Sequence, residues 1–265
     1  MAYDRPAVAA YFDQLAEGEW RRFEKAALGA IHEHIHNLYL ERFVLRGSRV
    51  LEIGAGPGRF TQTLHRLGCR IVVADISDVQ LGLNRRYGSE NGFASSVEAY
   101  EKLDICDLTA LPNASFDVVV AYGGPLSYVF ERRDDAVESC RRVLKPGGVL
   151  LASVMSLWGT LHRHLAALKD LPLWSTKNIV ETGDLTPEND PTSPHKCHLF
   201  RSAELAISWS VTDSPSRRWR RRTRSARIWS RCCSSYASNR IAGRHCSTSR
   251  PRRRHNPATS MGEHT

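Results

Sequence analysis

The residues best suited to bind a small ligand are three glycines that directly follow a short apolar run. The run spans residues 50–53, and Gly54, Gly56 and Gly58 then form a G-x-G-x-G turn. A turn with so little side-chain bulk lets backbone N–H groups approach a ligand closely. Glu52 precedes the turn and would repel a pyrophosphate, and the spacing differs from the G-x-G-x-x-G of dinucleotide sites. The pattern indicates a nucleotide-type ligand without phosphate groups, while a glycine triplet by itself is equally consistent with a purely structural turn.

An acidic residue further along the chain strengthens the ligand-binding interpretation. Asp75 ends a second apolar run, residues 70–75, and lies 21 residues after Gly54. In α/β nucleotide-binding folds, an acid at this distance accepts hydrogen bonds from the ribose hydroxyls. The alternative, in which Asp75 only caps a helix that starts near Ser77, explains the spacing less well.

Alternating strands and helices are needed to position these residues. Helical spacing predicts a helix from Arg59 to about Gly68, one beginning near Ser77, and an amphipathic one that ends near residue 145. Apolar runs predict five strands, at residues 50–53, 70–75, 97–103, 115–121 and 149–154. Strands and helices in this order predict an α/β fold with a Rossmann-like, doubly wound, mostly parallel sheet.

Two further helices are expected before the first strand. Asp4 caps the first, and Pro6 lies in its opening turn. The second is expected to run without interruption from about residue 19 to residue 43. Residues 32–36 have the sequence H-E-H-I-H, so His32 and His36 share a helix face at the spacing of an H-E-x-x-H motif, but no further metal ligand is identified and a set of histidines at the surface or the edge of the core is favoured. We therefore predict no metal site.

The positive charge of the chain is concentrated at one end. The 265 residues carry a formal net charge of +9, yet residues 211–265 contain 14 Arg, no Lys and only two acidic residues, so residues 1–210 are mildly acidic. The seven cysteines include no C-x-x-C pair, which argues against a zinc site or a disulfide framework. The sequence contains no run of about 18 apolar residues, so no membrane span is predicted, and no apolar signal segment is recognised at its N-terminus. A cytoplasmic location is expected.

The sequence resembles the class I S-adenosylmethionine-dependent methyltransferases, in particular those that act on small molecules. The resemblance covers roughly residues 8–205 and is strongest over residues 48–155. It rests on the glycine turn V-L-E-I-G-A-G-P-G-R, the strand I-V-V-A-D, the segment D-L-T-A-L-P, and R-V-L-K-P-G-G before the fifth strand. It implies S-adenosylmethionine as cofactor and methyl transfer to an O, N or C atom of a small molecule.

The resemblance also implies roles in cofactor binding for nine residues. They are Glu52, Gly54, Ala55, Gly56, Asp75, Ile76, Asp107, Leu108 and Tyr122. The first four would hold the amino-acid part of the cofactor, the next two would bind the ribose and the adenine ring, and Tyr122 would lie where the methyl group meets the acceptor. Asp107 would accept a hydrogen bond from the adenine amine, with Leu108 beside it. It is preferred to Asp104 because it lies five residues before Pro112, as in the D-x-x-x-L-P pattern of the family.

A general base is needed only where the acceptor is a hydroxyl or an ammonium group that must lose a proton. The candidates for this base are Tyr11, Tyr122, Tyr128, His195 and His198. The sequence does not rank them, and packing or a lid role is the alternative for each. The N-terminal helices are expected to cover the pocket and exclude water.

Four regions are predicted: a helical cap over residues 1–45, a cofactor-binding core over 46–156, a substrate-side region of helix and loop over 157–210, and a basic tail over 211–265. The tail has ten Ser, 14 Arg and almost no aliphatic side chains, so it cannot bury enough apolar surface to fold. It is interpreted as out-of-frame or degenerate sequence, as a disordered basic tail, or as a nucleic-acid-binding arm. The C-terminal edge strands that normally complete the sheet are expected to be missing.

Methyl transfer to a small molecule is the favoured function, because the motif set is complete whereas the basic charge is confined to the tail. The alternatives are a non-catalytic, cofactor-binding remnant of a methyltransferase and an RNA or DNA methyltransferase anchored by the tail. The loop after the fourth strand lacks the run N/D-P-P-Y/F of base-amino methyltransferases and the Pro-Cys of cytosine-C5 enzymes, which argues against a nucleic-acid partner. No oligomeric state is predicted.

Overall fold

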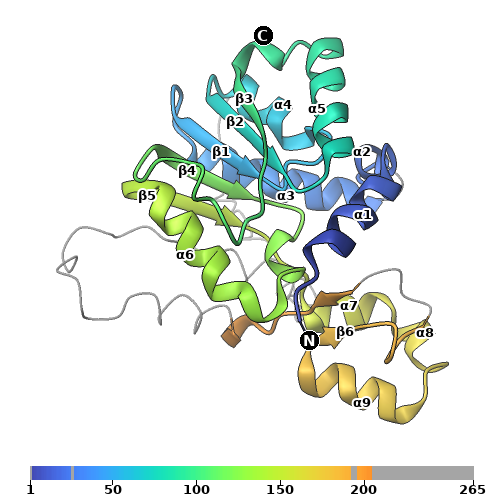
Figure 1. Ribbon diagram of the computed structural model, residues 1–265. Coiled ribbons are helices and arrows are strands. Elements are labelled where there is room, and N and C mark those ends of the chain that lie inside the picture. The colour runs from blue at the N-terminus through green and yellow to red at the C-terminus, as the bar shows by residue number, and fades with distance from the viewer. Residues whose placement is uncertain (1, 25–26, 192–195, 205–265) are drawn as a thin grey trace, which may run out of the picture.

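The computed structural model describes residues 2–24, 27–191 and 196–204, and within them a five-stranded sheet lies between helices (Figure 1). The strands of this sheet are β1 (Arg49–Ile53), β2 (Arg70–Asp75), β3 (Val97–Lys102), β4 (Phe116–Ala121) and β5 (Leu144–Ala152). The helices are α1 (Arg5–Leu15), α2 (Gly18–Arg21), α3 (Ala27–Phe43), α4 (Arg59–Arg66), α5 (Asp78–Glu90), α6 (Arg133–Val143), α7 (Leu157–Arg163), α8 (Leu165–Leu168) and α9 (Leu173–Thr182). Strands β6 (Asp184–Leu185) and β7 (Cys197–His198) pair antiparallel in a separate two-stranded sheet, the β6–β7 hairpin.

The strand order of the main sheet is β3-β2-β1-β4-β5, and every neighbouring pair is parallel. The chain builds outward from β1 to β3 and then returns to the other side of β1 to form β4. The order therefore reverses between β1 and β4, and in open α/β sheets this is where a ligand crevice forms at the carboxyl ends of the strands. The predicted α/β, doubly wound, mostly parallel sheet is confirmed.

The strands read as continuous apolar runs because both faces of the sheet are covered. Leu51 and Ile53 face the core beneath α6, whereas Val50 faces the core beneath α3 and α4. Figure 1 shows the same layers, with α6 on one side of the sheet and α3 on the other. Connections between parallel strands are right-handed. The helices that connect strands added on one side of β1 therefore cover one face of the sheet, and those that connect strands added on the other side cover the opposite face.

The N-terminal helices differ in part from the expectation. Asp4 caps α1 by accepting a hydrogen bond from the backbone N–H of Ala7 at 3.0 Å, as predicted. The predicted continuous helix over residues 19–43 is wrong, because α2 ends at Arg21 and α3 starts at Ala27. The two segments approach closely: a Cβ on Gly29 would lie 2.7 Å from the backbone oxygen of Phe23, so a larger side chain does not fit there.

Strand β5 begins earlier than the sequence indicated. It starts at Leu144, opposite Phe116, and its register jumps before Val149 pairs with Val118. The residues between form an irregularity in the strand, with Gly147 at φ +80°. The sequence predicted that the helix ends near residue 145 and that the strand starts at residue 149, and only the pairing with β4 shows that the strand extends on both sides of the irregularity.

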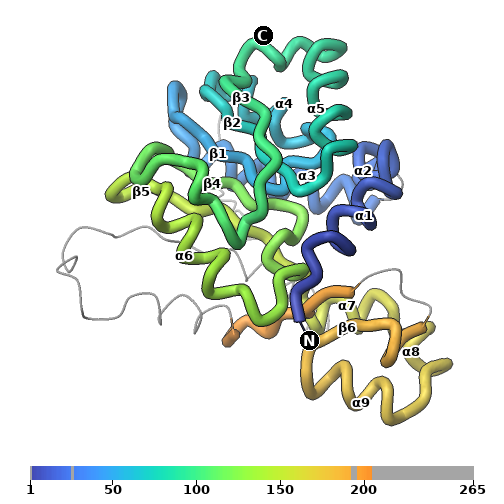
Figure 2. Tube along the Cα trace, in the orientation of Figure 1, coloured from blue at the N-terminus to red at the C-terminus, as the bar shows by residue number. Residues whose placement is uncertain are grey.

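A small lobe follows β5 and is coloured yellow to orange in Figures 1 and 2. The sequence predicted one helix near residues 161–168 and a loop over 184–194, whereas the structure has α7, α8, α9 and the β6–β7 hairpin. Its core contains Leu157, Ile179, Cys197 and Leu199, with Tyr128 from the loop after β4. The predicted tail and edge strands lie outside the described residues, and the four predicted region boundaries stay predictions.

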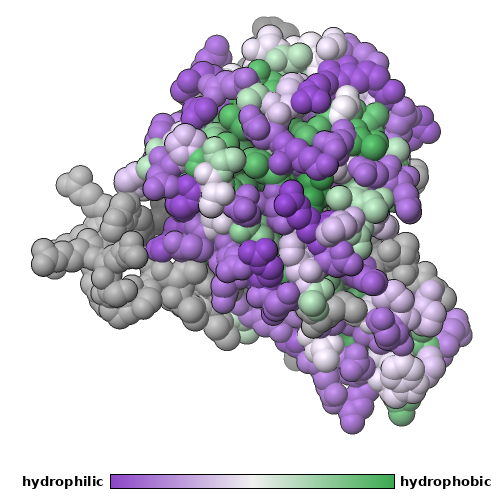
Figure 3. All heavy atoms as spheres, in the orientation of Figure 1, coloured by the Kyte–Doolittle hydropathy of each residue, from purple (hydrophilic) through white to green (hydrophobic). Residues whose placement is uncertain are grey.

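Hydrophilic residues cover most of the face shown in Figure 3. Within the described ranges, no helix combines the length and the apolar character that a membrane crossing requires.

Candidate functional site

A cavity lies at the carboxyl ends of β1, β2 and β4, where the strand order reverses. The glycine turn after β1 and the residues at the ends of β2 and β3 enclose one half of it. Helices α1 and α2 and the loop over residues 122–129 enclose the other half. The chain therefore places the predicted cofactor turn and the predicted cap around one space.

The glycine turn is shaped by two positions with positive φ, of which Gly54 is closely packed and Gly56 is open. Gly54 has φ +70°, and a Cβ on it would lie 2.5 Å from Cγ of Pro125. Gly56 has φ +54°, and a Cβ there would meet only Oε1 of Gln80, at 3.9 Å. Gly54 thus lets the loop after β4 pack on the turn, while Gly56 leaves the backbone open toward the cavity.

Glu52 lies beneath this turn rather than in the cavity. Its carboxylate accepts a hydrogen bond from Oγ1 of Thr61 at 2.6 Å, and Asn84 donates to the same Thr61 oxygen at 3.2 Å and to the backbone oxygen of Gly56 at 3.1 Å. Burial raises the pKa of Glu52 to about 8. The network ties β1, α4 and α5 together, so Glu52 supports the turn from below, and the structure does not bring it among the cavity-lining residues.

Asp75 lines the cavity where β2 ends. Its two oxygens accept hydrogen bonds from the backbone N–H of Gly56 at 2.8 Å and of Ser77 at 2.9 Å. These bonds aim the carboxylate across the turn and offset part of the cost of its burial. Burial still raises the pKa of Asp75 to about 6. Ile76, the next residue, also lines the cavity.

Of the two aspartates after β3, Asp104 faces the cavity and Asp107 faces solvent. Asp104 is buried and lines the cavity, where its Oδ2 accepts a hydrogen bond from the hydroxyl of Tyr3 at 2.9 Å and its Oδ1 one from the backbone of Cys106 at 2.9 Å. Asp107 is exposed and binds only its neighbour Thr109, at 3.1 Å to the backbone nitrogen and 2.6 Å to the hydroxyl. Because the backbone of Asp107 donates to that of Asp104 at 2.9 Å, the chain turns sharply and only the first aspartate faces inward.

The predicted neighbour of Asp107 is likewise remote from the cavity. Leu108 is fully buried in the core beneath α6. Ile105 takes the corresponding place in the cavity wall beside Asp104. The structure thus brings Gly54, Ala55, Gly56, Asp75, Ile76 and Tyr122 together around the cavity, and leaves Glu52, Asp107 and Leu108 outside it.

Aromatic rings form the cap side of the cavity. The ring of Tyr122 packs edge-on against Phe60 at a centroid distance of 5.2 Å, and that of Tyr128 packs edge-on against Phe12, also at 5.2 Å. Burial raises the pKa of both tyrosines. Their hydroxyls therefore stay protonated near neutral pH, which makes them poor general bases and suitable hydrogen-bond donors.

Two charged residues of the cap also reach the cavity, and the sequence interpretation missed both. Glu19 and Arg22 line it from α2 and its end, with Arg22 Nη1 3.1 Å from Glu19 Oε2. The Glu19 side chain is only 14% exposed. Arg59 lines the cavity as well, but Glu33 at 2.8 Å and Glu24 at 2.9 Å already neutralise it. The sequence gave no signal for Glu19 and Arg22, because its periodicity predicted one helix over residues 19–43 and not the separate short helix α2.

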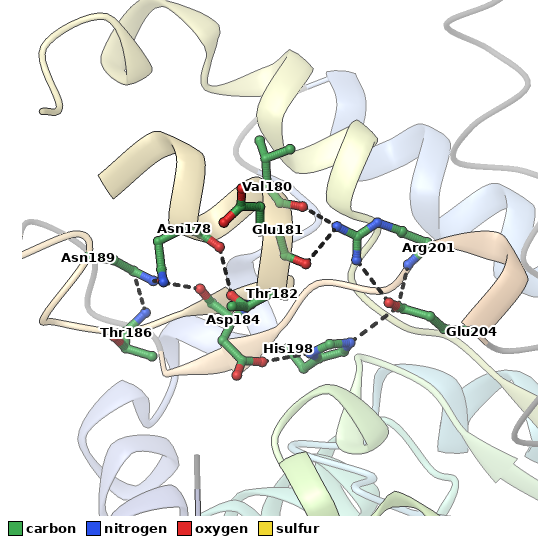
Figure 4. Close-up of polar contacts among 10 residues, drawn as sticks. All are labelled: Asn178, Val180, Glu181, Thr182, Asp184, Thr186, Asn189, His198, Arg201 and Glu204. Carbon is green, nitrogen blue, oxygen red and sulfur yellow. Dashed lines mark hydrogen bonds and ion pairs between the residues drawn. The ribbon is translucent and has the colours of Figure 1, made fainter. Parts of the chain in front are cut away.

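Two of the remaining candidate bases, His198 and Tyr11, lie away from the cavity. His198 is buried in the lobe, with Nδ1 2.7 Å from Oδ1 of Asp184 and Nε2 3.3 Å from Oε2 of Glu204 (Figure 4). Arg201 holds the same Glu204 at 2.9 Å, so the imidazole joins β6, β7 and the segment that follows. Tyr11 contacts Phe12 but does not line the cavity, and His195 lies outside the described residues.

His32 and His36 do not form part of a metal site in the structure. Over the described ranges, no group of three or more His, Cys, Asp or Glu residues is placed to hold a metal ion. His36 instead packs edge-on against Tyr122, with ring centroids 4.4 Å apart.

Known proteins similar to this chain share its sheet and its glycine turn region. Residues 51–152 match the methyltransferase domain family. The chain is 32% identical over 149 residues to the ubiquinone biosynthesis O-methyltransferase of Hahella chejuensis. This alignment covers 55% of this chain and 59% of that protein. It is 38% identical over 112 residues to the ubiquinone/menaquinone biosynthesis C-methyltransferase of Azotobacter vinelandii, covering 41% and 42% of the two chains. The chain thus spans about half the length of the curated relatives it matches.

The fold has solved counterparts as well. A SAM-dependent methyltransferase from Thermotoga maritima aligns with a TM-score of 0.50 at 19% identity, over 76% of this chain and 79% of the other. At this identity the likeness concerns the fold, which agrees with the strand order and the crevice between β1 and β4. Together with the domain match, the fold supports the assignment of residues 51–152 to a class I S-adenosylmethionine-dependent methyltransferase domain.

Proposed function

We propose that this protein transfers a methyl group from S-adenosylmethionine to an O, N or C atom of a small molecule. The observation that carries the proposal is the division of the cavity into two halves. One half has the open glycine turn, Asp75 and Asp104, and the other has aromatic rings supplied by the cap and the loop after β4.

The residues of the first half fit the cofactor. The backbone at Gly56 is open, because a Cβ there would meet nothing closer than 3.9 Å, so an amino-acid group has room over the turn. Asp75 is placed to accept hydrogen bonds from ribose hydroxyls, and Ile76 offers an apolar surface to the adenine ring. We assign the adenine amine to Asp104 rather than to Asp107, since only Asp104 lines the cavity. Glu52 acts through the turn that it supports.

The cofactor supplies a methyl group activated on a sulfonium, so the protein needs mainly to position the acceptor and exclude water. The rings of Phe12, Tyr122 and Tyr128 form an apolar wall that suits a small planar acceptor. With the cofactor bound, these rings would hold the acceptor atom against its methyl group, and transfer of that group would leave the electron pair of the broken carbon–sulfur bond on sulfur. Where the acceptor is a hydroxyl or an ammonium group, we assign its proton to Glu19, the carboxylate on the cap side of the cavity.

The names of the relatives support a small-molecule acceptor, since both belong to quinone biosynthesis and transfer to oxygen in one case and to carbon in the other. They do not decide between these atoms for this chain.

Calorimetric titration with S-adenosylhomocysteine tests cofactor binding, and a screen with labelled S-adenosylmethionine against small phenols, amines and activated carbon acids tests transfer. We expect binding by the wild type, a loss of about 1–3 kcal/mol in Asp75→Ala, and label on a small acceptor. Binding without transfer to any acceptor would support the non-catalytic remnant instead. Transfer to RNA or DNA that is lost on deletion of residues 211–265 would support the anchored nucleic-acid enzyme.

A further inference from the structure

The side-chain amide of Gln80 connects the cap helix to the cofactor half of the cavity. Gln80 lies in the first turn of α5 and is 1% exposed. Its Nε2 donates to the backbone oxygens of Phe12 at 2.8 Å and of Ala16 at 3.2 Å, at the end of α1. A backbone oxygen at a helix end needs a partner from outside the helix, and the Gln80 amide provides one.

These two bonds determine which way the amide points. Both contacts of Nε2 are carbonyl oxygens, so turning the amide over would set Oε1 against two acceptors. Oε1 therefore faces the other way, into the cavity, 3.9 Å from the position that a Cβ on Gly56 would take. This oxygen is buried and has no hydrogen-bond partner among the residues that the structure describes.

A buried acceptor without a partner is rare in proteins and calls for an explanation. The neighbours of Oε1 are the open face of Gly56 and the cavity wall that also contains Asp75. A donor group of a ligand placed over Gly56 would therefore be adjacent to Oε1.

We propose that Gln80 Oε1 accepts a hydrogen bond from a donor group of the bound cofactor, a ribose hydroxyl or the ammonium group, and that the same amide thereby couples cofactor binding to closure of α1. The proposal rests on the proposed function, because it concerns the same cavity. A ligand bond to Oε1 fixes the rotamer of the amide, and a fixed amide holds Phe12 and Ala16 through Nε2. Binding and closure then favour each other reciprocally.

Other contacts show that α1 is docked at residues beside the cofactor half. The hydroxyl of Ser77 hydrogen-bonds the carboxylate of Asp13, and the hydroxyl of Tyr3, just before α1, binds Asp104. Gln80 differs from both, because its Oε1 is a buried acceptor with no hydrogen-bond partner among the residues that the structure describes.

The test compares Gln80→Met with the wild-type full chain and with Gln14→Met. Gln14 lies on α1 and is exposed, so it controls for the substitution itself. We expect S-adenosylhomocysteine to bind Gln80→Met about tenfold more weakly than the wild type and to bind Gln14→Met unchanged. Equal affinity of Gln80→Met and the wild type would overturn the proposal. Failure of the wild type to bind S-adenosylhomocysteine at all would instead refute the proposed function.

A second ligand identifies the donor. 5′-Methylthioadenosine contains the ribose hydroxyls but no amino-acid group. Weaker binding of both ligands by Gln80→Met assigns the bond to the ribose, and weaker binding of S-adenosylhomocysteine alone assigns it to the ammonium group.

A second variant, Gln80→Glu, tests the coupling between cofactor binding and closure of α1. It also keeps the proposal testable if Gln80→Met does not fold. Gln80→Glu keeps an acceptor oxygen but cannot donate to Phe12 and Ala16. In the wild type, S-adenosylhomocysteine is expected to slow amide hydrogen exchange in α1, and in Gln80→Glu this slowing should be lost while the ligand still binds. Slowing of equal size in both proteins would overturn the coupling.

Discussion

The pH dependence of folding stability is predicted to depend on Glu52. This side chain is fully buried beneath the glycine turn, and burial raises its pKa from the usual 4.5 to about 8. Each pKa unit corresponds to about 1.4 kcal/mol of preference for one protonation state, so the shift amounts to several kcal/mol, up to about 5 kcal/mol.

The sign follows from which state holds the proton. Between about pH 4.5 and pH 8 the unfolded chain ionises at Glu52, whereas the folded protein keeps the proton. The folded state then binds more protons, so the free energy of unfolding falls as the pH rises through this window. Asp75 contributes with the same sign at lower pH, because its pKa is raised from 3.8 to about 6.

Urea unfolding of the wild type and of Glu52→Gln at several pH values between 4.5 and 8.5 tests this reasoning. The glutamine keeps an acceptor oxygen for Thr61 but cannot ionise, so the loss of stability above pH 6, beyond the range of Asp75, should largely disappear. Glu41→Gln, at an exposed position on α3, is the control and should follow the wild type. If Glu52→Gln loses as much stability as the wild type between pH 6 and 8.5, the titrating group is not Glu52.

Three further predictions concern the cavity and the lobe. Asp104→Ala should weaken binding of S-adenosylhomocysteine by about 1–3 kcal/mol while Asp107→Ala leaves it unchanged, as calorimetry can measure; the reverse result would restore the assignment made from the sequence. Gly54→Val should lower the free energy of unfolding, measured by urea titration, by at least about 1–3 kcal/mol. The reason is that its Cβ would approach Cγ of Pro125 to 2.5 Å at a φ of +70°. A variant as stable as the wild type would show that the loop after β4 moves freely. His198→Leu should speed hydrogen exchange in α9 and the β6–β7 hairpin without changing cofactor affinity, since His198 bridges Asp184 and Glu204; a loss of binding would place it in the site after all.

The sequence by itself determined the parts of the site that are built from neighbouring residues. An apolar run followed by glycines at Gly54, Gly56 and Gly58 specifies a strand and a turn locally. In the same way, the apolar run that ends at Asp75 specifies a strand with an acid at its carboxyl end. Alternation of such units determines a parallel sheet, and the strand order then places the carboxyl ends of β1 and β2 side by side. These features depend on backbone conformation and on short hydrophobic periods, which are visible in the chain itself.

Only the tertiary structure decided which polar side chains reach the cavity. Asp104 and Asp107 are three residues apart and chemically identical, and the tight turn between them points one inward and the other to solvent. Glu19 and Arg22 line the cavity from a short helix that ends at Arg21, where periodicity alone would continue the helix to residue 43. The orientation of Gln80 depends on Phe12, 68 residues away in the chain, and the pairing of His198 with Asp184 spans 14 residues, distances over which sequence periodicity carries no information about contact.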